Sequence, residues 1–217
     1  MQIPDTLLAQ RLSSVYWIMG GPCGGKTTQA EALCQKHSML HYNADQQMPK
    51  HKELANPVDH PALCRPFEGW ERYFGQPIEE YRAWLKAAND EAFGMVMLDL
   101  VGLAFQQKVI YEGHTSVELV CRVADKRNAI YLSPTEDVVR RDYLGRRDHR
   151  DMVELIRTLP KAEEICEKLL LMAIMGNREG EARARELGIP VIRRTAGSGT
   201  TELSAQIESQ FGLAVEH

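Results

Sequence analysis

The stretch that most limits how this chain can fold is Gly20-Gly21-Pro22-Cys23-Gly24-Gly25-Lys26-Thr27. It satisfies G-x-x-x-x-G-K-[S/T], a phosphate-binding loop when a buried strand precedes it and a helix follows it. Residues 15–19 are an unbroken apolar run, as expected of a buried parallel strand, and residues 28–36 have an apolar helical face. This context predicts a phosphate site, whereas the alternative is a glycine-rich turn that merely carries Lys-Thr.

The loop would bind the polyphosphate of a nucleoside triphosphate through backbone N–H groups and the positive end of the helix dipole. We expect Lys26 to reach the β- and γ-phosphates and the Thr27 hydroxyl to ligate Mg²⁺. Cys23 lies where a helix N-terminus should lower a thiol pKa, and we interpret it as a small loop residue, not a nucleophile. The predicted nucleotide-contacting residues are Gly21, Pro22, Cys23, Gly24, Gly25, Lys26, Thr27 and Thr28.

Length and composition restrict the class of protein. A chain of 217 residues with 44% hydrophobic residues fits one α/β domain with a lid or insertion, although length alone would allow two small domains. The net charge of −4 argues against a general nucleic-acid binder. Five cysteines without a C-x-x-C pair indicate reduced thiols. Because we find neither a signal-peptide pattern nor a bilayer-length apolar run, we expect a cytoplasmic protein with no membrane partner.

Two acidic residues follow predicted strands. Asp45 comes just after the strand 39–42, at the edge where ligands bind in open parallel sheets, or it only complements the dipole of the next helix. Glu112 ends the apolar run 108–112 and precedes Gly113. A carboxylate there can hold Mg²⁺ directly or through water, or orient an acceptor hydroxyl; the alternative is an acid that faces solvent. His114 is interpreted as a loop residue.

The segment between the second and third strands is unusual. Residues 46–76 are broken by four prolines and two glycines, and their aromatic residues alternate with basic ones. This composition suits a cover over an acceptor site, or the aromatics form a satellite core under a long loop. A long helix is expected over 77–107, so residues 46–107 are predicted as an acceptor-side helical insertion.

Residues 140–151 carry the densest charge of the chain, with five arginines within eleven residues. We interpret them as a lid over the phosphates, because guanidinium groups make bidentate phosphate contacts and stabilise a transferring phosphoryl group. The alternative is a solvated helix face with internal Arg–Asp pairs. The candidates for phosphate contact are Arg140, Arg141, Arg146 and Arg147, and we assign catalytic roles to Arg141 and Arg147.

The last part of the chain predicts further regular elements. Ser133 should cap a helix that starts with Pro134 and has Glu136 at its third position. Two separate helices are expected at 160–175 and near 179–187. A fifth strand at 189–193 is followed by a glycine-rich loop that could surround the nucleotide base.

Taken in order, these features resemble the small-molecule P-loop kinases of the nucleoside-monophosphate-kinase-like group. The likeness is to ATP-binding proteins described as adenylate-kinase-like or 2-phosphoglycerate-kinase-like. It implies one domain over 1–217, a three-layer α/β sandwich with a parallel five-stranded sheet in the order 2-3-1-4-5. It also implies ATP and Mg²⁺ as cofactors, with Asp45 as the acid that contacts the acceptor. The full arginine pattern of adenylate kinases and an Asp-x-Asp after the second strand are missing, so a hydroxyl-bearing small molecule is at least as suitable an acceptor as a nucleotide.

We therefore expect transfer of the ATP γ-phosphoryl group to a small-molecule acceptor, by a monomer or homodimer. Lys26 would bind phosphate, Thr27 and Glu112 would hold Mg²⁺, and Asp45 would accept or orient the acceptor proton. Three alternatives remain open: a nucleoside monophosphate kinase proper, a nucleotide-binding NTPase or regulatory module with no acceptor, and a kinase for an antibiotic or nucleotide sugar.

Overall fold

The computed structural model describes residues 3–213. Five strands form one sheet in the order β2-β3-β1-β4-β5, and every neighbouring pair is parallel. The strands are β1 (Val15–Gly20), β2 (Leu40–Asn43), β3 (Val109–Gly113), β4 (Ala129–Pro134) and β5 (Val191–Arg194). The predicted α/β class, strand order and direction are confirmed. Because the strands are parallel, the carboxyl ends of β1, β2 and β3 meet at one edge, where ligands bind in such sheets.

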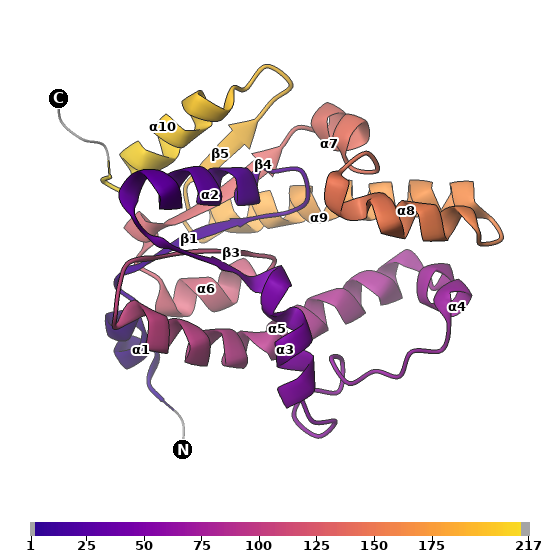
Figure 1. Cartoon of the computed structure of the whole chain (residues 1–217), viewed down its shortest axis with the longest axis horizontal. Coiled ribbons are helices and arrows are strands. Elements are labelled where there is room, and N and C mark those ends of the chain that lie inside the picture. Colours follow the sequence, from indigo (N-terminus) through magenta and orange to yellow (C-terminus); the bar gives the residue numbers. More distant parts are fainter. Residues whose placement is uncertain (1–2, 214–217) are drawn as a thin grey trace.

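Helices cover both faces of the sheet and make the predicted three layers (Figure 1). Along β1, Val15, Trp17 and Met19 face one apolar cluster and Tyr16 and Ile18 face the other, which is the two-residue alternation of a strand. One face is covered by α2 (Lys26–His37) and α10 (Thr200–Gln210), and the other by α1 (Asp5–Arg11), α5 (Ile78–Ala104), α6 (Val117–Val123) and α9 (Ala162–Glu186).

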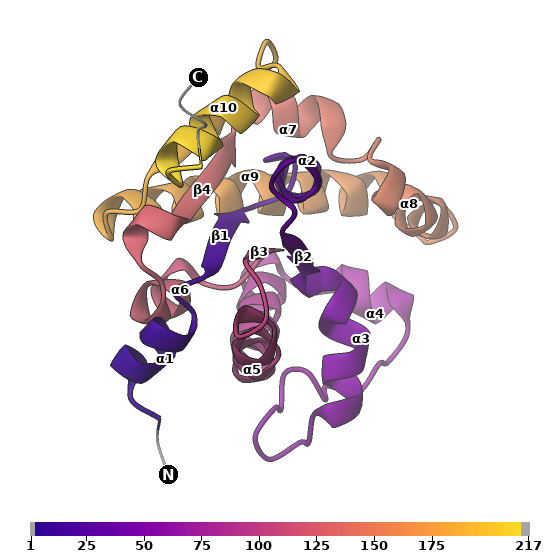
Figure 2. The same cartoon turned by 60° about the vertical axis from the view of Figure 1, so that its left-hand side comes forward.

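The remaining segments project from one side of the molecule, where α4 and α8 lie in both views (Figures 1 and 2). They comprise α3 (Ala44–Leu54) and α4 (Trp70–Gly75) of the insertion, then α7 (Glu136–Asp142), the 3₁₀ turn η2 (Arg147–His149) and α8 (Arg150–Arg157). A second 3₁₀ turn, η1 (Lys126–Asn128), lies elsewhere, between α6 and β4. An apolar cluster joins the insertion to α8 and α9 through Phe74, Tyr81, Ile156 and Leu169. Of the aromatics in residues 46–76, Tyr73 and Phe74 therefore belong to a satellite core, whereas Phe67 and Trp70 are exposed.

Two predictions about the second half of the chain are wrong. The two helices expected at 160–175 and 179–187 are one continuous helix, α9, because the burial of its apolar face overrides the low helix propensity of its internal glycines. Ser133 does not cap a helix: β4 continues through Pro134, and the Ser133 hydroxyl donates to Glu181 Oε2 at 2.5 Å. The next helix begins at Glu136, after Thr135. Within residues 3–213, no helix is long and apolar enough to cross a bilayer.

Candidate active site

The loop between β1 and α2 has the backbone shape that its sequence predicts. Gly25 precedes α2 with φ +87°, a left-handed conformation that favours glycine, and Cys23 adopts φ 64°. A side chain at Gly20 would place its Cβ 2.3 Å from the Leu132 carbonyl oxygen, so glycine is required there for close packing against β4. These constraints turn the chain sharply from the central strand into the N-terminus of α2.

Lys26 is folded over this loop. Its side chain is buried, with 7% of the residue surface exposed, and Nζ donates to the Gly21 carbonyl at 3.1 Å. Burial lowers the Lys26 pKa, while the carboxylates of Asp45 and Glu112 act in the opposite direction. An ammonium group held among acids at the carboxyl edge is placed to bind a polyphosphate.

The two residues predicted to hold Mg²⁺ are in contact. The Thr27 hydroxyl donates to Glu112 Oε2 at 3.1 Å, and Glu112 is only 3% exposed. Asn43 pairs with Glu112 across β2 and β3, and its Nδ2 donates to Oε1 at 2.6 Å; His41 Nε2 lies 3.4 Å from the same oxygen. A hydroxyl and a carboxylate fit Mg²⁺, which takes few protein ligands and completes its octahedron with waters and phosphates.

Asp45 lies beside this group in the first turn of α3. Its side chain is 58% exposed, and Oδ2 lies 3.5 Å from His114 Nε2. The charge of Lys26 lowers the His114 pKa to about 4, so the imidazole is neutral near pH 7. The helix itself is capped by Asn43, whose Oδ1 accepts from the Gln46 N–H at 3.1 Å, so Asp45 is not needed as its cap. His114 is a loop residue, as the sequence predicts, and its place directly after the acid and glycine of β3 is the sequence signal for its position beside Asp45.

The arginines of residues 140–151 differ in their surroundings. Arg141 pairs with Asp142 at 2.6 Å, an internal Arg–Asp pair of the kind that the alternative predicts, whereas Arg140 pairs with Glu136, which lies outside residues 140–151. Arg147 is exposed. Arg146 is half-buried and contacts the Cys23 thiol. Its positive charge contributes to lowering the pKa of Lys26 and the pKa of His114. Arg146 thus makes a side-chain contact with the loop, whereas Arg141 interacts with Cys23 only through its charge.

The expectation for the Cys23 thiol is wrong in direction. Burial raises the Cys23 pKa, and the charge of Arg146 only partly counteracts this effect. The side chain packs against Val138, Val139 and Leu170 instead of facing the helix N-terminus in water. A thiol in this environment stays protonated near neutral pH, which agrees with a packing role and not with that of a nucleophile.

A further contact to the loop comes from the end of β5. Arg194 donates through Nη1 to the Cys23 carbonyl at 2.5 Å and through Nη2 to Asp142 Oδ2 at 3.1 Å. Arg194 thus ties the loop to the end of α7. Sequence reasoning predicted only a loop near the base at this point, because nothing local links position 194 to position 23.

The sheet order, the loop between central strand and helix, and the helices on both faces define a P-loop kinase fold. No protein-family model matches the sequence, and no curated protein sequence matches it. Among solved structures, shikimate kinase from Acinetobacter baumannii in complex with shikimate superposes with a TM-score of 0.50 and 14% identity, over 97% of both chains. TT1252 from Thermus thermophilus superposes with a TM-score of 0.55 and 15% identity, over 93% of this chain and 98% of its own. At these identities the likeness concerns the fold.

Proposed function

We propose that this protein is an ATP-dependent phosphotransferase that moves the γ-phosphoryl group to a small molecule bearing a hydroxyl group. The observation that carries the proposal is the contact between the Thr27 hydroxyl and the buried Glu112 carboxylate, beside Lys26. A phosphate-binding loop alone requires only nucleotide binding. A buried acid from a neighbouring strand, bonded to the hydroxyl that should ligate the metal, supports a catalytic metal–phosphate site.

Catalysis of phosphoryl transfer consists largely of positioning and charge stabilisation. The loop amides and Lys26 would bind the β- and γ-phosphates, and Thr27 and Glu112 would hold Mg²⁺. When bound, the ion would neutralise charge on the phosphate oxygens. Asp45 would accept or orient the acceptor proton, because it is exposed at the same edge as Lys26 and Glu112.

Arg146 is the arginine that we favour for contact with the transferring phosphoryl group. It contacts Cys23 in the loop, and its charge is close enough to Lys26 to lower the pKa of that lysine. Arg141 and Arg147 remain proposed lid residues. Both are exposed in this arrangement and would reach the phosphates only if residues 140–151 moved toward the loop. Guanidinium groups suit this task because their charge and planar geometry match phosphate oxygens.

We propose that the acceptor binds beside Asp45, which lies in the first turn of α3, and under the insertion that follows it. One structural neighbour is a kinase bound to the small molecule shikimate, which agrees with this class of acceptor. We further propose that the protein acts in the cytoplasm as a monomer or homodimer, without nucleic acid or membrane as partner.

The test is ADP release from Mg-ATP with a panel of sugars, hydroxy acids, phosphoglycerate, amino alcohols and nucleoside monophosphates. We expect at least one hydroxyl compound to stimulate release and Lys26→Ala to abolish it without loss of the fold. Stimulation only by nucleoside monophosphates would favour a nucleoside monophosphate kinase. Hydrolysis indifferent to every compound would favour an NTPase, and tight binding without turnover a regulatory module.

A further inference from the structure

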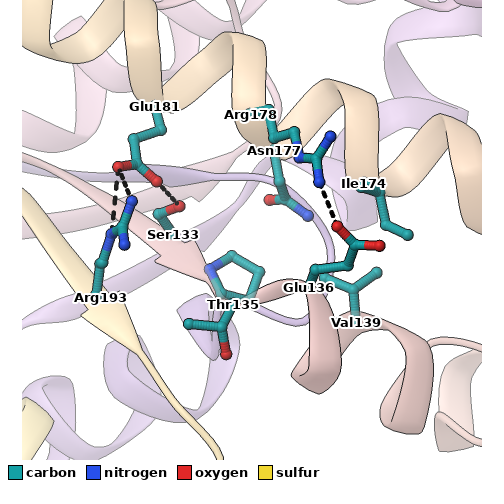
Figure 3. A pocket seen from close by; sticks show the side chains of 10 residues that line it. Ser133, Thr135, Glu136, Val139, Ile174, Asn177, Arg178, Glu181 and Arg193 are labelled. Carbon is teal, nitrogen blue, oxygen red and sulfur yellow. Dashed lines mark hydrogen bonds and ion pairs between the residues drawn. The ribbon is translucent and has the colours of Figure 1, made fainter.

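The phosphate-binding loop is also held from the other face of the sheet, by α9. Asn177 lies in the second half of this helix and is only 3% exposed. Its Nδ2 donates to the Pro22 carbonyl at 3.2 Å, a contact between residues 155 positions apart in sequence. Figure 3 shows its side chain projecting from α9 between Ser133 and Glu136.

The packing between α9 and the loop is close. A Cβ at position 21 would lie 2.3 Å from Asn177 Oδ1 and 2.9 Å from Cγ. Gly21 does not adopt a left-handed φ, so its backbone would accept alanine, and Asn177 is the reason that position 21 has no side chain. One turn along α9, a Cβ at Gly180 would lie 2.0 Å from the Tyr131 hydroxyl, so α9 also packs closely against β4 at this point.

A contribution to the stability of the fold does not explain why position 177 is an asparagine. Within residues 3–213, its Oδ1 has no hydrogen-bond partner although the atom is buried. A buried polar atom without a partner lowers the free energy of unfolding, so an apolar side chain of similar size would stabilise this position better. The side-chain amide of Asn177 therefore lowers stability through Oδ1, while its Nδ2 holds the Pro22 carbonyl.

We infer that Asn177 is a positioning residue that fixes residues 21 and 22 in the loop conformation that binds phosphate. The Gly21 carbonyl accepts from Lys26 Nζ at 3.1 Å, so a shift at position 21 would move the partner of the lysine. Pre-organisation of this kind strengthens binding because less order has to be created when the ligand arrives. The inference rests on the nucleotide site of the proposed function but does not depend on the acceptor.

Asn177 also lines a cavity. A cavity of about 170 Å³ is lined by Asn177, Ser133, Glu136 and Glu181, among others (Figure 3). Its charged groups are already paired, Glu136 with Arg178 and Glu181 with Arg193, so we do not assign it a ligand. Without the Asn177 amide, the Pro22 carbonyl would lose its donor on this side.

The test measures the affinity for Mg-ATP by isothermal titration calorimetry, with thermal unfolding of each variant. Asn177→Ala should weaken binding about tenfold, the equivalent of one lost hydrogen bond. Gly21→Ala should weaken it more strongly, because the new Cβ clashes with the amide. The double variant should bind like Asn177→Ala and better than Gly21→Ala, because alanine at 177 removes the three atoms nearest to the new Cβ.

Met172→Ala is the matched control, because Met172 is also buried on α9 but packs in the cluster with Phe74 and Ile156, apart from the loop. It should lower the melting temperature and leave the affinity unchanged. The inference is overturned if Asn177→Ala binds like wild type, if the double variant is no better than Gly21→Ala, or if wild type does not bind Mg-ATP. Should Mg-ATP binding behave as predicted while no acceptor is phosphorylated, only the proposed transferase activity fails.

Discussion

Replacing the buried carboxylate at the metal site, Glu112→Gln, should weaken the response of this protein to Mg²⁺ about 10–100-fold, whereas its effect on stability is partly offset. Glutamine keeps the shape of the side chain but has one acceptor oxygen, whereas Glu112 accepts from Thr27 Oγ1 at 3.1 Å and from Asn43 Nδ2 at 2.6 Å. If the new NH₂ group faces Asn43, that donor loses its acceptor; if it faces Thr27, the hydroxyl has to turn and accept instead of donating. The lost charge-assisted hydrogen bond costs about 1.5–3 kcal/mol, and removal of a buried charge offsets part of it.

The loss in metal affinity, unlike the loss in stability, is not offset by the removal of a buried charge. Loss of the anionic oxygen next to Thr27 should reduce metal affinity about 10–100-fold, whether the carboxylate binds Mg²⁺ directly or through water. This corresponds to about 1.4–2.8 kcal/mol. Calorimetric titration with ATP, with and without Mg²⁺, measures the effect as the factor by which Mg²⁺ strengthens nucleotide binding.

Glu208→Gln is the matched control, because Glu208 is also a buried carboxylate and bonds Lys36 and His37 at the opposite end of α2. It should leave the Mg²⁺ factor unchanged. The reasoning is refuted if Glu112→Gln retains the wild-type factor, or if Glu208→Gln reduces it to the same degree.

Three further predictions follow from the same geometry. Asp45→Asn should reduce acceptor-dependent turnover about 10²–10⁴-fold, the range for a general base, with little change in the Kd for Mg-ATP measured by calorimetry. Arg146→Ala should reduce kcat/KM on the order of 10²-fold in steady-state ADP release, whereas Arg141→Ala should cost less than about fivefold because its exposed ion pair contributes little. Although burial alone would raise the Glu181 pKa, hydrogen bonds from Ser133, Arg193 and Arg185 lower it to about 2. Its stabilising effect is therefore complete above about pH 4.5 and is lost as the pH falls toward 2, so the melting temperature of Glu181→Gln should fall less steeply over this interval.

Each of these predictions has an outcome that would contradict it. Loss of Mg-ATP affinity in Asp45→Asn with normal turnover of bound substrate would make Asp45 a structural residue. Equal losses in the Arg146 and Arg141 variants would show that closeness to Cys23 does not select the phosphate-binding arginine. If the melting temperatures of wild type and Glu181→Gln fell equally steeply over this pH interval, Glu181 would not be responsible for the pH dependence of stability.

The parts of the site that could be predicted from sequence lie on strand ends close to a motif. Thr27 is part of the motif, and Glu112 ends an apolar strand, so a parallel sheet brings them to one edge whatever the rest of the chain does. The strand order required the resemblance to a known group of kinases. Here local pattern and global fold agree, and the prediction was confirmed by the sheet topology.

The remaining contacts depend on long-range packing that no local pattern encodes. Asn177 and Arg194 reach the loop from more than 150 positions away, and each looks like an ordinary helix or strand residue in the sequence. Which of the clustered arginines contacts the loop depends on how the chain turns after α7 ends at Asp142, and the composition of residues 140–151 does not specify this turn. The prediction for the Cys23 pKa was wrong for a similar reason. The position of Cys23 before a helix suggests a lowered pKa, but residues distant in the sequence bury the thiol, and burial raises the pKa.

The central claim is that the phosphoryl group reaches a small molecule, and its fate measures this directly. ATP labelled at the γ-phosphate should be incubated with Mg²⁺, the protein and the compound that most stimulates ADP release, followed by phosphorus NMR or mass spectrometry of the products. The account predicts that the label appears on an oxygen of the acceptor, in step with ADP, and not at all with Lys26→Ala. Label that appears only as inorganic phosphate, at the same rate with and without the compound, would contradict it.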